Sequence, residues 1–139
     1  MKISIVCGSQ KAALAAEKMQ TAMYDIHGTE ARVFDTQNID ELYLQGGDAV
    51  VLADEGDNAA VINWLNEKGA KLALGGLLGA VLSLDGGAAD VLAMLGERET
   101  DISASLALDG ADEADLKAFG RDVAIKTAQL VGNWSLDFD

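Results

Sequence analysis

The opening residues limit the possible folds of this chain more than any other segment. Ile3, Ile5 and Val6 are apolar and β-branched, which is typical of a short strand buried on both faces. Gly8 and Ser9 interrupt this pattern, and an alanine-rich segment with helical spacing follows. A strand, a tight turn and a helix form the first half of a βαβ unit. Because the turn directs free backbone N–H groups and the positive end of a helix dipole above the strand, we expect a ligand site there.

The rest of the chain alternates between strand and helix patterns. The first strand ends at Cys7, and the later strands are expected at 31–34, 48–53, 80–84 and 102–108. The helices are expected at 11–27, 59–68, 88–95 and 112–130, and residues 133–139 as a tail. Residues 35–47 are expected to be irregular with one helical turn at 39–42, and periodicity assigns no structure to 71–79. In the first helix, the apolar side is expected to consist of Leu14, Met19, Met23 and Ile26, with Gly28 as the C-cap.

Strands that alternate with helices predict a parallel sheet with right-handed crossovers and helices on both faces. The expected fold is therefore α/β, a three-layer doubly wound sheet of five parallel strands in the order 2-1-3-4-5. No repeat or linker divides the chain, so residues 1–139 are expected to form a single domain. In such sheets ligands bind beyond the carboxyl ends of the strands, where the strand order reverses. The loops at 8–13, 54–58 and 85–89 are the ones that meet there.

Composition restricts the classes of partner. The formal net charge is −13, which predicts no binding to nucleic acid and none to anionic membrane surfaces. No apolar run reaches the length of a membrane span and no signal-peptide pattern follows Met1, so we expect a cytoplasmic protein. One cysteine and one histidine exclude a disulfide framework and the usual Cys/His zinc sites, and we assign no metal.

Several stretches resemble the flavodoxin-like superfamily. The sequence Ile5-Val-Cys-Gly-Ser-Gln10 is similar to the first strand and the start of the phosphate loop of these proteins. Residues 61–65 and 77–87 resemble the branch that contains NAD(P)H:quinone oxidoreductases and NADPH-dependent FMN reductases, and residues 115–124 are similar to its last helix. The resemblance implies a flavodoxin-like fold with bound FMN. The implied activity is electron transfer, or reduction of a quinone or flavin by NAD(P)H.

By position, the resemblance also implies which residues hold FMN. Residues 9–14 would wrap the phosphate, and the loops after the third and fourth strands would flank the isoalloxazine ring. The implied cofactor-binding residues are Ser9, Gln10, Lys11, Ala12, Ala13, Leu14, Ala53, Asp54, Glu55, Asn58, Leu84, Asp85, Gly86 and Gly87. Because the flavin would perform the chemistry, no catalytic acid, base or nucleophile is assigned.

The chain departs from the pattern of the family, which is roughly Ser/Thr-x-x-Gly-x-Thr in the phosphate loop. Ala12 stands at the glycine and Leu14 at the second threonine. The loops after the third and fourth strands contain carboxylates and no aromatic residue. Two functions therefore stay open: an FMN-binding redox protein, or a flavodoxin-like scaffold that has lost FMN and acts as a binding or assembly module. In the second case Leu77 and Leu78, or the tail around Trp134, would mediate homo-oligomers.

For three single residues, a place in the core competes with a role in the site. Cys7 is expected to be a small buried side chain rather than a reactive thiol, and Trp64 is expected in the core. Tyr43 is the one aromatic residue that could reach the site, although packing is the stronger interpretation.

Overall fold

The computed structural model describes residues 1–98 and 101–132, with backbone alone for 101–105. The expected tail at 133–139, including Trp134, lies outside the described residues. A single parallel sheet forms the centre of the molecule, and its order β2-β1-β3-β4-β5 confirms the predicted order. The strands are β1 (Lys2–Cys7), β2 (Glu30–Asp35), β3 (Ala49–Asp54), β4 (Leu78–Ser83) and β5 (Asp101–Asp109).

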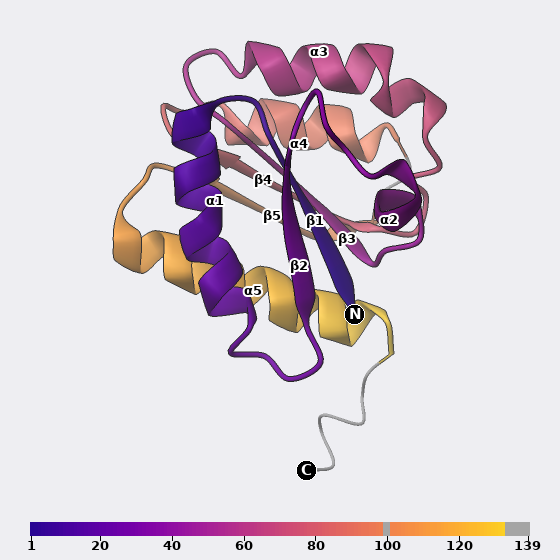
Figure 1. Cartoon of the computed structure of the whole chain (residues 1–139), viewed down its shortest axis with the longest axis vertical. Coiled ribbons are helices and arrows are strands. Elements are labelled where there is room, and N and C mark those ends of the chain that lie inside the picture. The colour runs from indigo at the N-terminus through magenta and orange to yellow at the C-terminus, as the bar shows by residue number, and fades with distance from the viewer. Residues whose placement is uncertain (99–100, 133–139) are drawn as a thin grey trace.

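Helices cover both faces of the sheet, as predicted for a three-layer α/β fold (Figure 1). One face carries α1 (Gln10–Met23) and α5 (Glu113–Leu130). The other face carries α2 (Glu41–Gln45), α3 (Ala59–Glu67) and α4 (Ala88–Gly96), with a 3-10 turn, η1 (Gly69–Lys71), after α3. Every residue of β3 and β4 is buried, because these strands are covered on both sides. Among the residues whose side chains the structure describes, two separate apolar cores result, one on each face of the sheet.

The first helix differs from the prediction at its end and on its buried side. It stops at Met23 rather than near His27, and a turn then leads to Gly28, whose φ of +80° redirects the chain into β2. Leu14 is 56% exposed, so its expected place on the apolar side is wrong. The buried side of α1 is built mainly from small residues, namely Ala12, Ala15, Ala16, Met19, Ala22 and Met23.

A close crossing of helices explains why α1 buries small residues. At Gly120 of α5, an added Cβ would lie 2.5 Å from the backbone oxygen of Met19. The two helices approach this closely only without a side chain at that point. Ala15 and Ala16 belong to the same apolar core. The larger Leu14 therefore lies outside the contact.

The remaining boundaries shift by a few residues. The segment 71–79, which periodicity left unassigned, contains the last residue of η1 and the start of β4, which begins at Leu78 rather than at Ala80. The helical turn expected at 39–42 is a short helix at 41–45. The last helix begins as predicted, since the Asp112 carboxylate accepts a hydrogen bond of 3.3 Å from the backbone N–H of Asp115.

Candidate functional site

The carboxyl ends of β1, β3 and β4 bring the three expected loops together. Cys7 of β1 pairs with Ala53 of β3, and Asp54 pairs with Ser83 of β4. The chain after β1 stays attached to β3, because the Gly8 N–H donates to the carbonyl of Ala53 at 2.9 Å. The three loops that carry the sequence-predicted site residues therefore lie at the carboxyl end of the sheet. Which ligands they can bind depends on the hydrogen bonds that their polar groups already form within the chain.

The N-terminus of α1 is bonded to a carboxylate of the same chain. Ser9 is the N-cap, and its Oγ accepts from the backbone N–H of Ala12 at 3.1 Å. The same hydroxyl donates to Oε2 of Glu55 at 2.6 Å. Glu55 therefore places a negative charge beside the positive end of the helix, the position in which helix N-termini bind anions.

Asp54 is a buried carboxylate, 3% exposed, that holds the loop after β3. Its Oδ1 accepts from the Glu55 N–H at 2.8 Å and its Oδ2 from the Val61 N–H at 3.1 Å. The carboxyl group also lies directly over Gly8, where an added Cβ would overlap it. Asp54 thus joins the loop to the start of α3, and its position requires a glycine at the end of β1.

Cys7 lies below this carboxylate and is 1% exposed. Burial raises the pKa of its thiol to about 12, and the nearby charges of Asp54, Asp35 and Glu17 raise it further. The thiol is therefore neutral at physiological pH. This confirms the interpretation of Cys7 as a small buried side chain rather than a nucleophile.

The loops after β3 and β4 are bonded to each other across the space between them. The Gly56 N–H donates to Oδ2 of Asp85 at 2.6 Å, and the Asn58 amide donates to the Gly86 carbonyl at 3.1 Å. The Ser83 hydroxyl, at the end of β4, donates to Oδ1 of Asn58 at 2.8 Å. Asn58 has a positive φ of 62°, a backbone conformation that asparagine adopts more readily than most residues. Sequence reasoning missed Ser83, although a hydroxyl at the end of an apolar strand was a signal.

The residues present do not fit FMN in the position that the resemblance implies. The phosphate position at 9–14 is bordered by the Glu55 carboxylate, which already engages the hydroxyl of Ser9. The ring position is bridged by the bonds from Gly56 to Asp85 and from Asn58 to Gly86. Neither loop supplies an aromatic ring to stack on a flavin.

Two hollows lined by described residues lie on either side of these bonded loops. A small hollow of about 240 Å³ between α1 and α5 is bordered by four of the predicted site residues, Lys11, Leu14, Leu84 and Asp85. On the other side, a hollow of about 570 Å³ is bordered by Ser9, Gln10 and Ala13, and by the chain after β2. Ala12 and Ala53 are fully buried and border neither.

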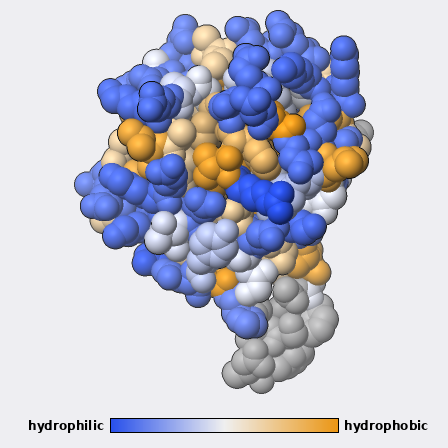
Figure 2. Space-filling view, viewed as in Figure 1, coloured by the Kyte–Doolittle hydropathy of each residue, from blue (hydrophilic) through white to orange (hydrophobic). Residues whose placement is uncertain are grey.

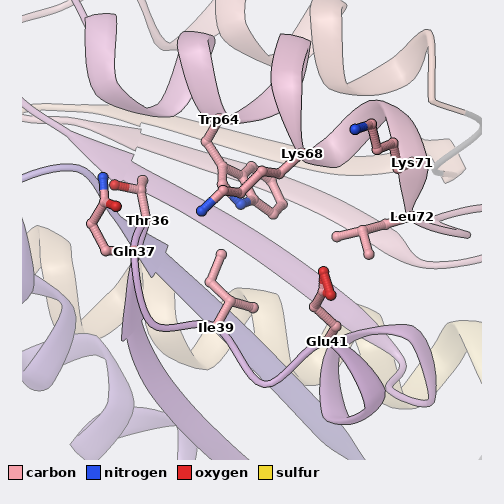
Figure 3. A pocket seen from close by; sticks show the side chains of 8 residues that line it. All are labelled: Thr36, Gln37, Ile39, Glu41, Trp64, Lys68, Lys71 and Leu72. Atoms are coloured by element: carbon pink, nitrogen blue, oxygen red, sulfur yellow. The ribbon is translucent and has the colours of Figure 1, made fainter.

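The hollow of about 570 Å³ continues along α3. Two further hollows, of about 350 and 380 Å³, share Thr36 and Gln37 with it and extend past Trp64 to Lys68. The last of these is shown in Figure 3. Sequence reasoning missed this region. The available signal was the spacing of Trp64 and Lys68, one helical turn apart at the end of the predicted helix, with Lys71 shortly after it.

The other aromatic candidate lies away from this region. Tyr43 is 7% exposed, stacks against the Arg32 guanidinium at 4.2 Å and meets the edge of Phe34 at 6.0 Å between ring centroids. Its role is packing beside the edge strand β2, which confirms the stronger interpretation. Trp64, 3% exposed, belongs to the core beneath α3, as predicted.

Figure 2 shows that hydrophilic residues cover most of one face of the molecule, with apolar residues in small groups between them. In the described parts of the chain, no helix combines the length and apolar character needed to cross a membrane.

Comparison with known proteins shows the fold. No protein-family model and no curated protein matches this chain. Among solved structures, a flavodoxin from the domain Archaea is similar over 91% of this chain and 99% of its own, with 15% identity and a TM-score of 0.74. A flavodoxin from Streptococcus pneumonia TIGR4 is similar over the same shares, with 16% identity and a TM-score of 0.72. The flavodiiron protein of Giardia intestinalis matches 95% of this chain over 37% of its own, with 14% identity and a TM-score of 0.64. The chain therefore has a flavodoxin-like fold.

Proposed function

We propose that this chain is a binding module with a flavodoxin-like fold that does not hold FMN. The observation that carries the proposal is the hydrogen bond from Ser9 to Glu55 at the N-terminus of α1. It gives the helix end an anion from within the chain and engages the one side-chain hydroxyl of the phosphate loop. A binding module of this kind keeps the fold and uses another part of the surface.

Charge repulsion supports the proposal. Two like charges about 4 Å apart repel by ~4 kcal/mol at an effective dielectric constant near 20, and the phosphate of FMN is a dianion. Asp54 and Asp85 add negative charge to the same edge of the sheet. A phosphate at this helix end would have to displace Glu55 and would still face the other two carboxylates.

A second candidate function is favoured by the fold likeness to flavodoxins. In that case the chain binds FMN and acts in electron transfer, or in reduction of a quinone or flavin by NAD(P)H. This function requires the loop from Glu55 to Asn58 to open. It also requires Glu55 to leave Ser9.

A flavin titration separates the two functions. Purified protein is titrated into FMN and, separately, into riboflavin, which lacks the phosphate, and flavin fluorescence is followed. We expect no saturable quenching of either flavin by the wild-type chain, whereas saturable quenching of FMN would overturn the proposal. Glu55→Gln is expected to strengthen any weak association of FMN but not that of riboflavin, because it removes a carboxylate that repels the FMN phosphate. Asp122→Asn on the exposed side of α5 removes the same charge elsewhere and is the matched control.

A further inference from the structure

The region along α3 contains a hollow of about 380 Å³, within the range of small-molecule sites. We call it the lysine groove, and its lining residues are Thr36, Gln37, Ile39, Glu41, Trp64, Lys68, Lys71 and Leu72. One wall comes from α3 and η1 and the other from the chain between β2 and α2 (Figure 3). We propose that the lysine groove binds a small organic carboxylate with an apolar body. This deepens the proposed function, because it names the ligand class of the module.

The middle of the lysine groove is apolar. Figure 3 shows the Trp64 ring projecting from α3 and the Ile39 side chain extending toward it from the opposite wall. Leu72 points into the same space. Trp64 is anchored in the core, so its ring forms a fixed floor, while Ile39 and Leu72 are partly exposed. These side chains suit the aliphatic or aromatic part of a ligand.

The charged groups of the groove favour an anion. Lys68 and Lys71 are exposed at its α3 wall, and neither forms an ion pair within the part of the chain that the structure describes. In a chain with 10 basic against 23 acidic residues, two neighbouring lysines without a partner are a local exception. Glu41 on the opposite wall limits the charge that the groove accepts. A single carboxylate is therefore favoured over a phosphate dianion.

Uncharged donors complete the groove. The Trp64 indole N–H forms no hydrogen bond with the described residues, and Figure 3 shows its nitrogen on the side of Thr36 and Gln37. The hydroxyl of Thr36 and the amide of Gln37 also have no partner within the described ranges. A carboxylate near Lys68 would lie among these donors, and donors of this kind set the orientation of a ligand.

The indole N–H of Trp64 supplies the test. Trp134→Phe leaves Trp64 as the sole tryptophan, so a proton–nitrogen correlation spectrum contains a single indole signal. The probes are hexanoate and hexanamide, which share an apolar body and differ in charge. We expect hexanoate to shift the indole signal saturably and hexanamide to bind about tenfold more weakly, since two exposed ion pairs contribute roughly this factor. Added salt should weaken the binding of hexanoate and leave the binding of hexanamide unchanged.

Lysine variants test whether Lys68 and Lys71 bind the carboxylate of the ligand. The double variant Lys68→Gln/Lys71→Gln is expected to bind hexanoate about tenfold more weakly than the parent, and no more tightly than it binds hexanamide. Lys126→Gln, an exposed lysine of α5, is the matched control and should bind as the parent. All three positions are exposed, so folding is retained. No saturable shift, equal affinity for the two probes, or an unaffected double variant would each overturn the inference.

The two proposals fail in different ways. If the chain binds FMN, flavin fluorescence is quenched whatever hexanoate does, and the binding-module proposal fails alone. If hexanoate leaves the indole signal unchanged while FMN also does not bind, the ligand class is wrong and the binding module stands.

Discussion

At the scale of single residues, the end of β1 is constrained by a neighbouring carboxylate. Gly8 has no positive φ, so its backbone does not require glycine. The Asp54 carboxyl group, held by the N–H groups of Glu55 and Val61, occupies the volume that a Cβ would need. The requirement for glycine therefore comes from packing against a buried polar group.

Gly8→Ala is expected to destabilise the protein by about 2 kcal/mol, because either Asp54 or the strand end must move. The free energy of unfolding is measured by urea denaturation. In an Asp54→Ala background the same change should cost less, because the obstructing carboxyl is gone. Equal costs in the two backgrounds would show that Asp54 is not the cause.

Cys7 is expected to make stability depend on pH above neutrality. Its pKa is about 12 in the folded chain against a reference value of 9.0, so the unfolded chain loses the thiol proton first as pH rises. The contribution to stability is complete below pH 9.0 and is lost between there and about pH 12, at up to ~1.4 kcal/mol per pH unit. Urea denaturation of wild type and Cys7→Ala at increasing pH measures it. The wild type should decline more steeply, and parallel curves would contradict the prediction.

At the scale of elements, the contact between α1 and α5 depends on Gly120. Because a Cβ there would meet the backbone of Met19, the contact cannot adjust by rotating a side chain. Gly120→Ala is expected to force the helices apart and lower the free energy of unfolding by about 2 kcal/mol, despite the higher helix propensity of alanine. Lys126→Ala, on the exposed side of α5, should stay within ~0.5 kcal/mol of wild type. A stabilised Gly120→Ala variant would mean that propensity outweighs the contact.

The sheet could be predicted from the sequence because each strand carries its own signal. Continuous apolar runs such as 48–53 indicate strands buried on both faces, and their alternation with helices leaves few topologies. The buried side of α1 could not be predicted in the same way. Leu14 fits helical spacing, but only the position of Gly120 on another helix shows that small residues form the contact.

The position of the candidate site could be predicted from the sequence, but the hydrogen bonds and charges within it could not. The loops after β1, β3 and β4 meet because parallel strands end at one edge. Whether Glu55 turns toward Ser9, and whether Asn58 reaches Gly86, depends on loop conformation that no periodic pattern encodes. The lysine groove was missed because its walls are separate in sequence.

At the scale of the whole molecule, the negative charge opposes folding. The net charge is −13, and within the described ranges the ion pairs are Arg32–Asp40, Lys117–Glu113 and Arg121–Asp25, all exposed. Exposed pairs of this kind contribute ~1 kcal/mol or less each. Repulsion between the remaining carboxylates is therefore the larger electrostatic effect.

Added salt is expected to stabilise the protein, because it screens this repulsion more than it weakens the few pairs. The melting temperature at neutral pH should rise from low ionic strength to ~0.15 M NaCl. Sucrose at equal osmolality is the control for effects not due to charge. A melting temperature that falls with salt would show that attractive pairs dominate.

The bonds among the loops after β1, β3 and β4 also set an energetic threshold for any molecule that enters between them. Such a guest must break the bonds from Ser9 to Glu55, Gly56 to Asp85 and Asn58 to Gly86 together. At about 0.5–1.5 kcal/mol each, their loss would weaken binding roughly tenfold to a thousandfold. These bonds within the chain fix the three loops, and the binding that we propose uses the lysine groove beside α3 instead.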